Sequence, residues 1–130
     1  MANFTVDDDI TRKQGADLTG KLYYIVKQDT TAQQVVLAAG ATDKLFGVLS
    51  QLNKAGSAAV GATVNIHARN ASGTYKVVAG GTIAIGDQIT SNASGQAIAT
   101  TTSGNEVLGE ACEAAVSGQI FEYLPRTNKY

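Results

Sequence analysis

The 130-residue sequence has one cysteine, one histidine, one proline and no tryptophan. A single Cys112 cannot form an intramolecular disulfide, so the sequence gives no sign of an oxidising compartment. No apolar run approaches the length of a membrane span, and residues 1–13 lack the apolar core of a secretory signal. We therefore expect synthesis in a cytoplasm and no contact with a membrane.

Charged residues are also scarce, at 16% of the chain with a formal net charge of −1. The lysines and arginines are scattered and do not form the basic face that a phosphate backbone selects, so we expect no nucleic acid partner. The polar surface must come from threonine, serine, asparagine and glutamine. A surface of this kind favours packing against other protein subunits.

The composition that is present favours strands and tight turns. Fourteen glycines stand against one proline, and alanine, valine and threonine are frequent. We predict a mainly β, small single-domain fold, either a β-barrel or a sandwich, with at most one short helix, around Ala41 to Leu45. Residues 1–20 show no sustained hydrophobic period and are expected to form an extended arm, which leaves residues 21–130 as the β-rich domain.

The alternation of apolar and polar residues locates individual strands. Residues 21–29 predict the first strand, with Tyr23 on one of its faces. In the strand expected from residue 62 to 69, Val64 and Ile66 face the core, while His67 and Arg69 face outward. A turn over residues 70–73 is expected to join this strand to the next one as a hairpin.

The stretch from Gly80 to Thr100 predicts two short strands around a turn at residues 92–95. Ile83, Ile85 and Ile89 are expected to fill the core. Residues 105–127 predict two more strands that meet around residues 117–118. The expected structural turn residues are Gly86, Asp87 and Gly95.

No combination of residues predicts catalysis. His67 is the only histidine, so a serine or cysteine nucleophile with a histidine base would have to use it, and no nucleophile motif accompanies it. Cys112 is flanked by Glu110 and Glu113, which would raise its pKa rather than activate it. The acidic run at residues 7–9 lacks the spaced ligands of a calcium loop. We therefore predict a protein that is not an enzyme, with no catalytic, cofactor-binding or metal-binding residues.

Three phrases of the sequence carry a resemblance to a known family. They are LFGVLSQLNKAGSAAVGATVNIHA, then YKVVAGGTIAIGDQITSNASGQAIAT, then EVLGEACEAAVSGQIFEYLPRT, and they cover roughly residues 45–126. In this order they resemble the small capsid cement, or decoration, proteins of tailed bacteriophages. The resemblance implies a virion protein on the capsid exterior that binds the major capsid protein, and a homo-oligomer that is commonly a trimer.

The N-terminal arm is the expected capsid contact, because its polar–apolar alternation has no obvious partner within the chain. An arm that is disordered or exchanged with a neighbouring subunit is the alternative. A receptor- or glycan-binding module, either a head-fibre base or an adhesion domain, is the alternative function, with Tyr75, Tyr123 and Tyr130 as its candidate aromatics. The proposed contact residues are Ala2, Asn3, Phe4, Thr5, Val6, Asp7, Asp8 and Asp9.

Overall fold

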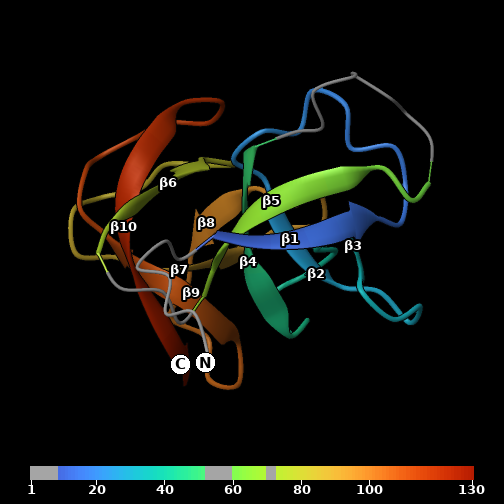
Figure 1. The fold of residues 1–130 in the computed structure, drawn as a ribbon. Coiled ribbons are helices and arrows are strands. Elements are labelled where there is room, and N and C mark those ends of the chain that lie inside the picture. The colour runs from blue at the N-terminus through green and yellow to red at the C-terminus, as the bar shows by residue number, and fades with distance from the viewer. Residues whose placement is uncertain (1–8, 52–59, 70–72) are drawn as a thin grey trace, which may run out of the picture.

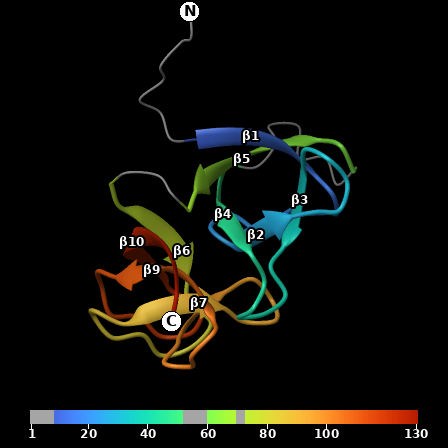
Figure 2. The ribbon, with the colours of Figure 1, turned by 90° about the horizontal axis from the view of Figure 1, so that it is seen from below.

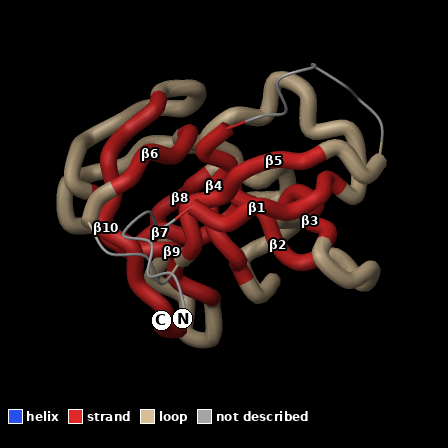
Figure 3. Tube along the Cα trace, in the orientation of Figure 1, coloured by secondary structure: helices blue, strands red, loops and turns tan. Residues whose placement is uncertain are grey.

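The computed structural model describes residues 9–51, 60–69 and 73–130. Its regular elements within these residues are ten β-strands, and none is a helix (Figure 3). The strands form a five-stranded closed barrel and a five-stranded second sheet that lie next to each other (Figures 1 and 2). The prediction of a mainly β, barrel-like fold is therefore confirmed.

The barrel contains the first five strands in the order β1-β3-β2-β4-β5. Neighbouring strands are antiparallel except β1 and β3, which are parallel. Apolar side chains from every strand but β1 fill the barrel interior, together with Leu18 from the loop after β1. The strands span β1 (Asp9–Gln14), β2 (Ile25–Gln28), β3 (Gln34–Leu37), β4 (Leu45–Gln51) and β5 (Thr63–Ala68).

The second sheet has the strand order β6-β10-β9-β7-β8, with antiparallel neighbours throughout. A larger hydrophobic core lies between this sheet and the barrel, and it combines Ile25 and Val48 from the barrel with Phe121 and Tyr123 from β10. The strands span β6 (Tyr75–Val78), β7 (Gln88–Ser91), β8 (Ala97–Ala99), β9 (Glu106–Ala111) and β10 (Ile120–Lys129).

The alternation predicted for β5 is confirmed, because Val64 and Ile66 are buried and His67 is only partly covered. The hairpin predicted after it is wrong. β5 pairs with β1 and β4 inside the barrel, whereas β6 pairs with β10 in the second sheet. The chain therefore crosses from one sheet to the other at this point, which a local turn signal could not reveal.

Two other expectations near the start of the domain need correction. The first domain strand spans only Ile25–Gln28, because Tyr23 adopts a positive φ of 66° that ends any extended run before it. The Tyr23 carbonyl instead accepts a hydrogen bond from the Val78 N–H at 3.0 Å, which links the two sheets. The short helix expected at Ala41–Leu45 is a turn leading into β4.

The arm predicted for residues 1–20 is wrong for its second half. β1 belongs to the barrel and pairs with β5 from Asp9↔His67 to Lys13↔Thr63. Leu18 is 1% exposed in the barrel core. The apolar–polar alternation of this segment is too short to predict a buried strand, since the β5 residues that pair with it lie about 50 residues later in the sequence. Residues 1–8 lie outside the described residues.

Candidate functional site

The described residues offer little for chemistry. They contain no group of histidine, cysteine, aspartate or glutamate that could hold a metal ion, and no helix among them is long and apolar enough to cross a membrane. The His67 ring packs on Tyr75, with 4.1 Å between ring centroids. Burial, followed by the charges of Glu122, Glu110 and Glu113, raises the pKa of the Cys112 thiol. A raised pKa disfavours the thiolate that nucleophilic catalysis requires.

The predicted turn at Gly86 has a φ of 90°, a backbone conformation that glycine adopts without strain. The Asp87 N–H donates to the Ala84 carbonyl at 3.1 Å and closes the turn. The Asp87 carboxylate in turn accepts a hydrogen bond from the Ala84 N–H at 2.9 Å. Gly86 and Asp87, both predicted as turn residues, therefore stabilise the backbone of a tight turn.

A second turn at Val116–Gln119 repeats this arrangement. The Gln119 N–H donates to the Val116 carbonyl at 3.0 Å, and the Gln119 side-chain oxygen accepts from the Val116 N–H at 3.0 Å. Gly118 has a φ of 89°. Between the two turns, Ile83 and Ala115 exchange a reciprocal pair of backbone hydrogen bonds of 2.8 and 3.1 Å. The two loops are thus related by a local twofold pattern of hydrogen bonds.

The first turn, the second turn and the start of β10 each expose an apolar side chain. Ile85 is 72% exposed, Val116 52% and Ile120 51%. We call these three residues the turn patch. Ile83 and Ile89 are buried as predicted, but the expectation that Ile85 fills the core is wrong. It occupies the tip of the turn, where the chain reverses and its side chain points out.

The turn at Gly95 docks the second sheet on the barrel. The Gly95 carbonyl accepts a hydrogen bond from the Ile25 N–H of β2 at 2.7 Å. Its φ is 77°, and a Cβ at this position would lie 2.9 Å from the Ile25 carbonyl oxygen. The Asn92 side chain shapes the turn by accepting hydrogen bonds from the Ser94 and Gln96 N–H groups, both at 2.9 Å. Only a glycine fits both requirements.

Arg69, directly after β5, clamps the other end of the junction between the sheets. Its Nη1 lies 3.1 Å from Oε1 of Glu106. Its other two nitrogens reach three backbone carbonyls at a β-bulge in the β9–β10 pair: Nε donates to Val107 at 2.8 Å and Arg126 at 3.1 Å, and Nη2 donates to Asn128 at 2.7 Å. The single guanidinium therefore satisfies acceptors on two strands of the second sheet.

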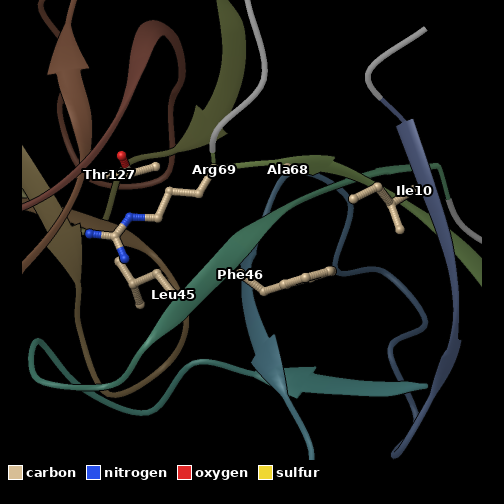
Figure 4. Close-up of a pocket in the computed structure, with 6 residues that line it drawn as sticks. All are labelled: Ile10, Leu45, Phe46, Ala68, Arg69 and Thr127. Carbon is tan, nitrogen blue, oxygen red and sulfur yellow. The ribbon is translucent and has the colours of Figure 1, made fainter. Parts of the chain in front are cut away.

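A pocket of about 370 Å³ opens beside this clamp, between the barrel and the end of β10 (Figure 4). Four of its six lining residues are apolar. The two polar residues are Thr127 and Arg69, whose three nitrogens each donate a hydrogen bond to β9 or β10. The lining residues are Ile10, Leu45, Phe46, Ala68, Arg69 and Thr127.

The proposed capsid-contact residues are only partly described. Asp9 belongs to β1, where its backbone pairs with His67, and it is therefore not part of an unpartnered arm. Residues 2–8 lie outside the described residues. The sequence also did not indicate the turn patch or the pocket. An isoleucine immediately before a glycine in a predicted turn is the one local signal that could have marked Ile85 as exposed.

Comparisons with known proteins give a consistent picture. The sequence model of the phage cement protein family matches residues 17–122. A crystal structure of the head fibre gp8.5 N base of bacteriophage phi29 superimposes with a TM-score of 0.68 at 21% identity, covering 94% of this chain and 96% of that one. No curated protein matches the sequence. Because the family match spans most of the chain, the protein belongs to the phage cement protein family, a family of phage structural proteins rather than enzymes.

Proposed function

We propose that this protein binds the outer surface of an assembled phage capsid and stabilises the contacts between major capsid protein subunits. The observation that carries the proposal is the family match over residues 17–122. In this proposal the protein is made in the host cytoplasm, acts as a homo-oligomer with a trimer as the expected form, and ends on the exterior of the virion. A symmetric oligomer presents the same contact several times to a symmetric shell.

The architecture suits a structural role. The shared core, the Gly95–Ile25 hydrogen bond and the Arg69 clamp tie the two sheets together at several points. A rigid body of this kind loses little conformational entropy when it binds. The turn patch adds exposed apolar surface, which favours association with another protein surface.

The N-terminal arm supplies the proposed specific contact. Residues 2–8 pair by strand addition with the capsid protein, where main-chain hydrogen bonds give affinity and alternate side chains give specificity. Phe4 and Val6 are the apolar anchors of this contact, and the aspartates at positions 7 and 8 favour a basic patch on the shell. Several such arms in one oligomer bind more tightly than one arm alone through effective concentration.

Mixing purified protein with undecorated capsids, followed by sedimentation and heating, tests the proposal. We expect the protein to sediment with assembled capsids and to raise their melting temperature, because a ligand that binds only the assembled shell stabilises it by mass action. A protein that stays in the supernatant would contradict capsid binding. Binding without a rise in melting temperature would reduce the role to decoration.

A head-fibre base is the second candidate, and the structural similarity to the phi29 head-fibre base favours it. The aromatic residues do not strengthen a glycan-binding version of this function. Tyr123 is fully buried and Tyr75 packs against the core, which leaves Tyr130, 46% exposed, among the three candidates. Clear saccharide binding on a glycan array would favour this alternative over cementing.

A further inference from the structure

The two turns at Gly86 and Gly118 belong to a longer repeat in the second sheet. Gly118 lies 32 residues after Gly86, and the same shift maps residues 75–91 onto residues 107–123. β6 then corresponds to most of β9, and β7 to the start of β10. Two residue pairs between β6 and β10 correspond to the two pairs between β9 and β7: Val78↔Ile120 and Val77↔Phe121 match Glu110↔Gln88 and Gly109↔Ile89.

The hydrogen bonds between the turns follow the same shift. The Gly86 N–H donates to the Ala111 carbonyl at 2.8 Å, and the Gly118 N–H donates to the Ala79 carbonyl at 2.8 Å. The Ala111 N–H then donates to the carbonyl of the residue after Gly86 at 2.9 Å. The Ala79 N–H likewise donates to the carbonyl of the residue after Gly118 at 2.7 Å. Each turn therefore closes on the strand end of the other half of the repeat.

A pseudo-twofold axis relates the two halves. The reciprocal hydrogen bonds between Ile83 and Ala115 map onto each other under the shift, so the axis passes between these two residues. Ile89 and Phe121 also correspond, and both are buried in the same core. The symmetry ends at β8, which pairs with β7, whereas β10 pairs with β9. Only positions 79 and 86 carry the same amino acid as their counterparts, so backbone pairing reveals the repeat and sequence identity does not.

A third turn shows that turn type alone does not define the repeat. Gly104 has a φ of 92°, and its N–H donates to the carbonyl of the C-terminal Tyr130 at 3.3 Å. The Asn105 side chain does not return to the first residue of its turn as Asp87 does. It donates to the Thr100 hydroxyl oxygen at 2.8 Å. Among the described residues, no isolated bridge joins this turn to another.

We propose that residues 75–91 and 107–123 are two copies of one strand–turn–strand unit, and that the copies interlock and open together. Each copy pairs its first strand with the second strand of the other copy, β6 with β10 and β9 with β7. Each turn also binds the end of the first strand of the other copy. Opening one copy therefore removes the hydrogen-bond partners of the other.

The repeat separates fold from surface at the turn patch. Each turn patch residue corresponds to a small or polar residue in the other copy: Ile85 to Ser117, Val116 to Ala84, and Ile120 to Gln88. Since the two copies share one backbone arrangement, that arrangement does not require an apolar side chain at any of these positions. The turn patch can therefore be changed while the unit stays intact.

Exchange of the turn sequences tests the equivalence of the copies. One variant gives the first turn the residues of the second, and the other variant does the reverse: Ala84→Val, Ile85→Ser and Asp87→Gln, against Val116→Ala, Ser117→Ile and Gln119→Asp. Both variants keep the turn glycine and a side-chain oxygen that accepts from the N–H of the first turn residue. Each should therefore change the melting temperature of the isolated protein by less than about 2 °C. A larger fall in either variant would overturn the equivalence.

The matched controls remove the side-chain acceptor from each turn. Asp87→Ala and Gln119→Ala should each lower the melting temperature by about 3 °C, because the N–H that the side chain accepts from loses its partner. The two falls should be equal within about 2 °C, since the two side chains have the same role. A fall at only one of the two positions would contradict the equivalence of the copies.

Native-state hydrogen exchange of the full-length protein tests the interlock. The Ile83 and Ala115 amides should show protection factors within about threefold of each other, because one opening event exposes both. Asp87→Ala should lower both protection factors alike, although it alters only the first turn. Protection factors that differ by more than this, or an effect confined to Ile83, would overturn the proposal. Neither experiment contains capsids, so failure of the repeat is distinguishable from failure of capsid binding.

Discussion

Arg69 and Glu106 form an ion pair that joins the barrel to the second sheet. The Nη1–Oε1 distance is 3.1 Å, and the two side chains are 12% and 8% exposed. Glu106 also lies 4.0 Å from the exposed Lys129 ammonium. Since Arg69 binds three carbonyls at the β10 bulge as well, its guanidinium is the centre of a polar network in an otherwise apolar junction.

Replacing Arg69 with methionine should lower the free energy of unfolding by about 3 kcal/mol, because it leaves the Glu106 carboxylate buried without its close partner. Arg69→Lys should recover only part of this loss, since an ammonium lacks the planar fork that reaches both the carboxylate and the carbonyls. Urea unfolding followed by circular dichroism measures both. A loss below about 1 kcal/mol for Arg69→Met would show that the clamp is not a main stabilising contact.

Tyr123 provides a test of a buried polar group. It is fully buried, and its hydroxyl has no hydrogen-bond partner among the described residues. We expect Tyr123→Phe to raise the free energy of unfolding by about 1 kcal/mol, because the folded state no longer buries an unsatisfied hydroxyl. Phe121→Leu, in the same strand and core, is the control and should destabilise the protein. A destabilised Tyr123→Phe variant would show that the hydroxyl is satisfied in solution.

The same residue predicts a pH dependence. Burial, and secondarily the neighbouring Tyr75, raises the pKa of Tyr123 well above its ordinary value of 10. The folded state therefore holds this proton more tightly than the unfolded state does. Its contribution is fully present below about pH 10 and is lost as the pH rises further, while the unfolded chain ionises. Denaturant unfolding at pH 9 and at pH 11 measures the free energy of unfolding. Its decrease between the two pH values should be smaller in Tyr123→Phe than in the unmodified protein.

Local patterns predicted much of the second sheet. Turn residues between short apolar runs located β7 with β8, and β9 with β10, because these strands pair with their neighbours in sequence. The same reasoning failed between β5 and β6, whose partners are distant in sequence. It also failed for β1, since burial of Gln14 and Leu18 depends on barrel closure.

Alanine substitutions at the turn glycines, Gly86 and Gly118, and at the strand glycine, Gly47, should lower the free energy of unfolding by different amounts. Gly86→Ala should cost about 1–2 kcal/mol, because its φ of 90° strains an L residue while an added Cβ would meet no atom within 4 Å. Gly118→Ala should cost the same, since its environment is equivalent. Gly47→Ala should cost more than either, because its Cβ would collide with the His67 backbone carbonyl. Equal losses at all three positions, measured by urea unfolding, would contradict this distinction.

A substitution in the turn patch should weaken capsid binding without changing the stability of the protein. Ile85→Asp should change the free energy of unfolding by less than about 0.5 kcal/mol, because the side chain is 72% exposed. Under the proposed function it should weaken capsid binding, which sedimentation at increasing protein concentration measures. Ile83→Ser, two residues away in the core, is the contrasting control and should cost about 3 kcal/mol or more in stability. Unchanged capsid affinity in Ile85→Asp would exclude the patch as a contact.

The candidate site was harder to predict than the fold. Gly86, Asp87 and Gly95 stood out because turn chemistry is local, and each holds a backbone reversal. The pocket joins Ile10, Phe46 and Thr127, which three separate strands bring together. No local period contains that information. Arg69 was expected to face outward, and only the neighbouring sheet turns its side chain into a clamp.

Calorimetry of undecorated capsids titrated with the full-length protein tests whether the protein stabilises an assembled shell, as we propose. The capsid melting temperature should rise with the logarithm of free protein concentration once binding begins to saturate. A variant lacking residues 2–8 should keep its own melting transition and lose this effect. A capsid melting temperature that stays constant across saturating protein concentrations would contradict the claim.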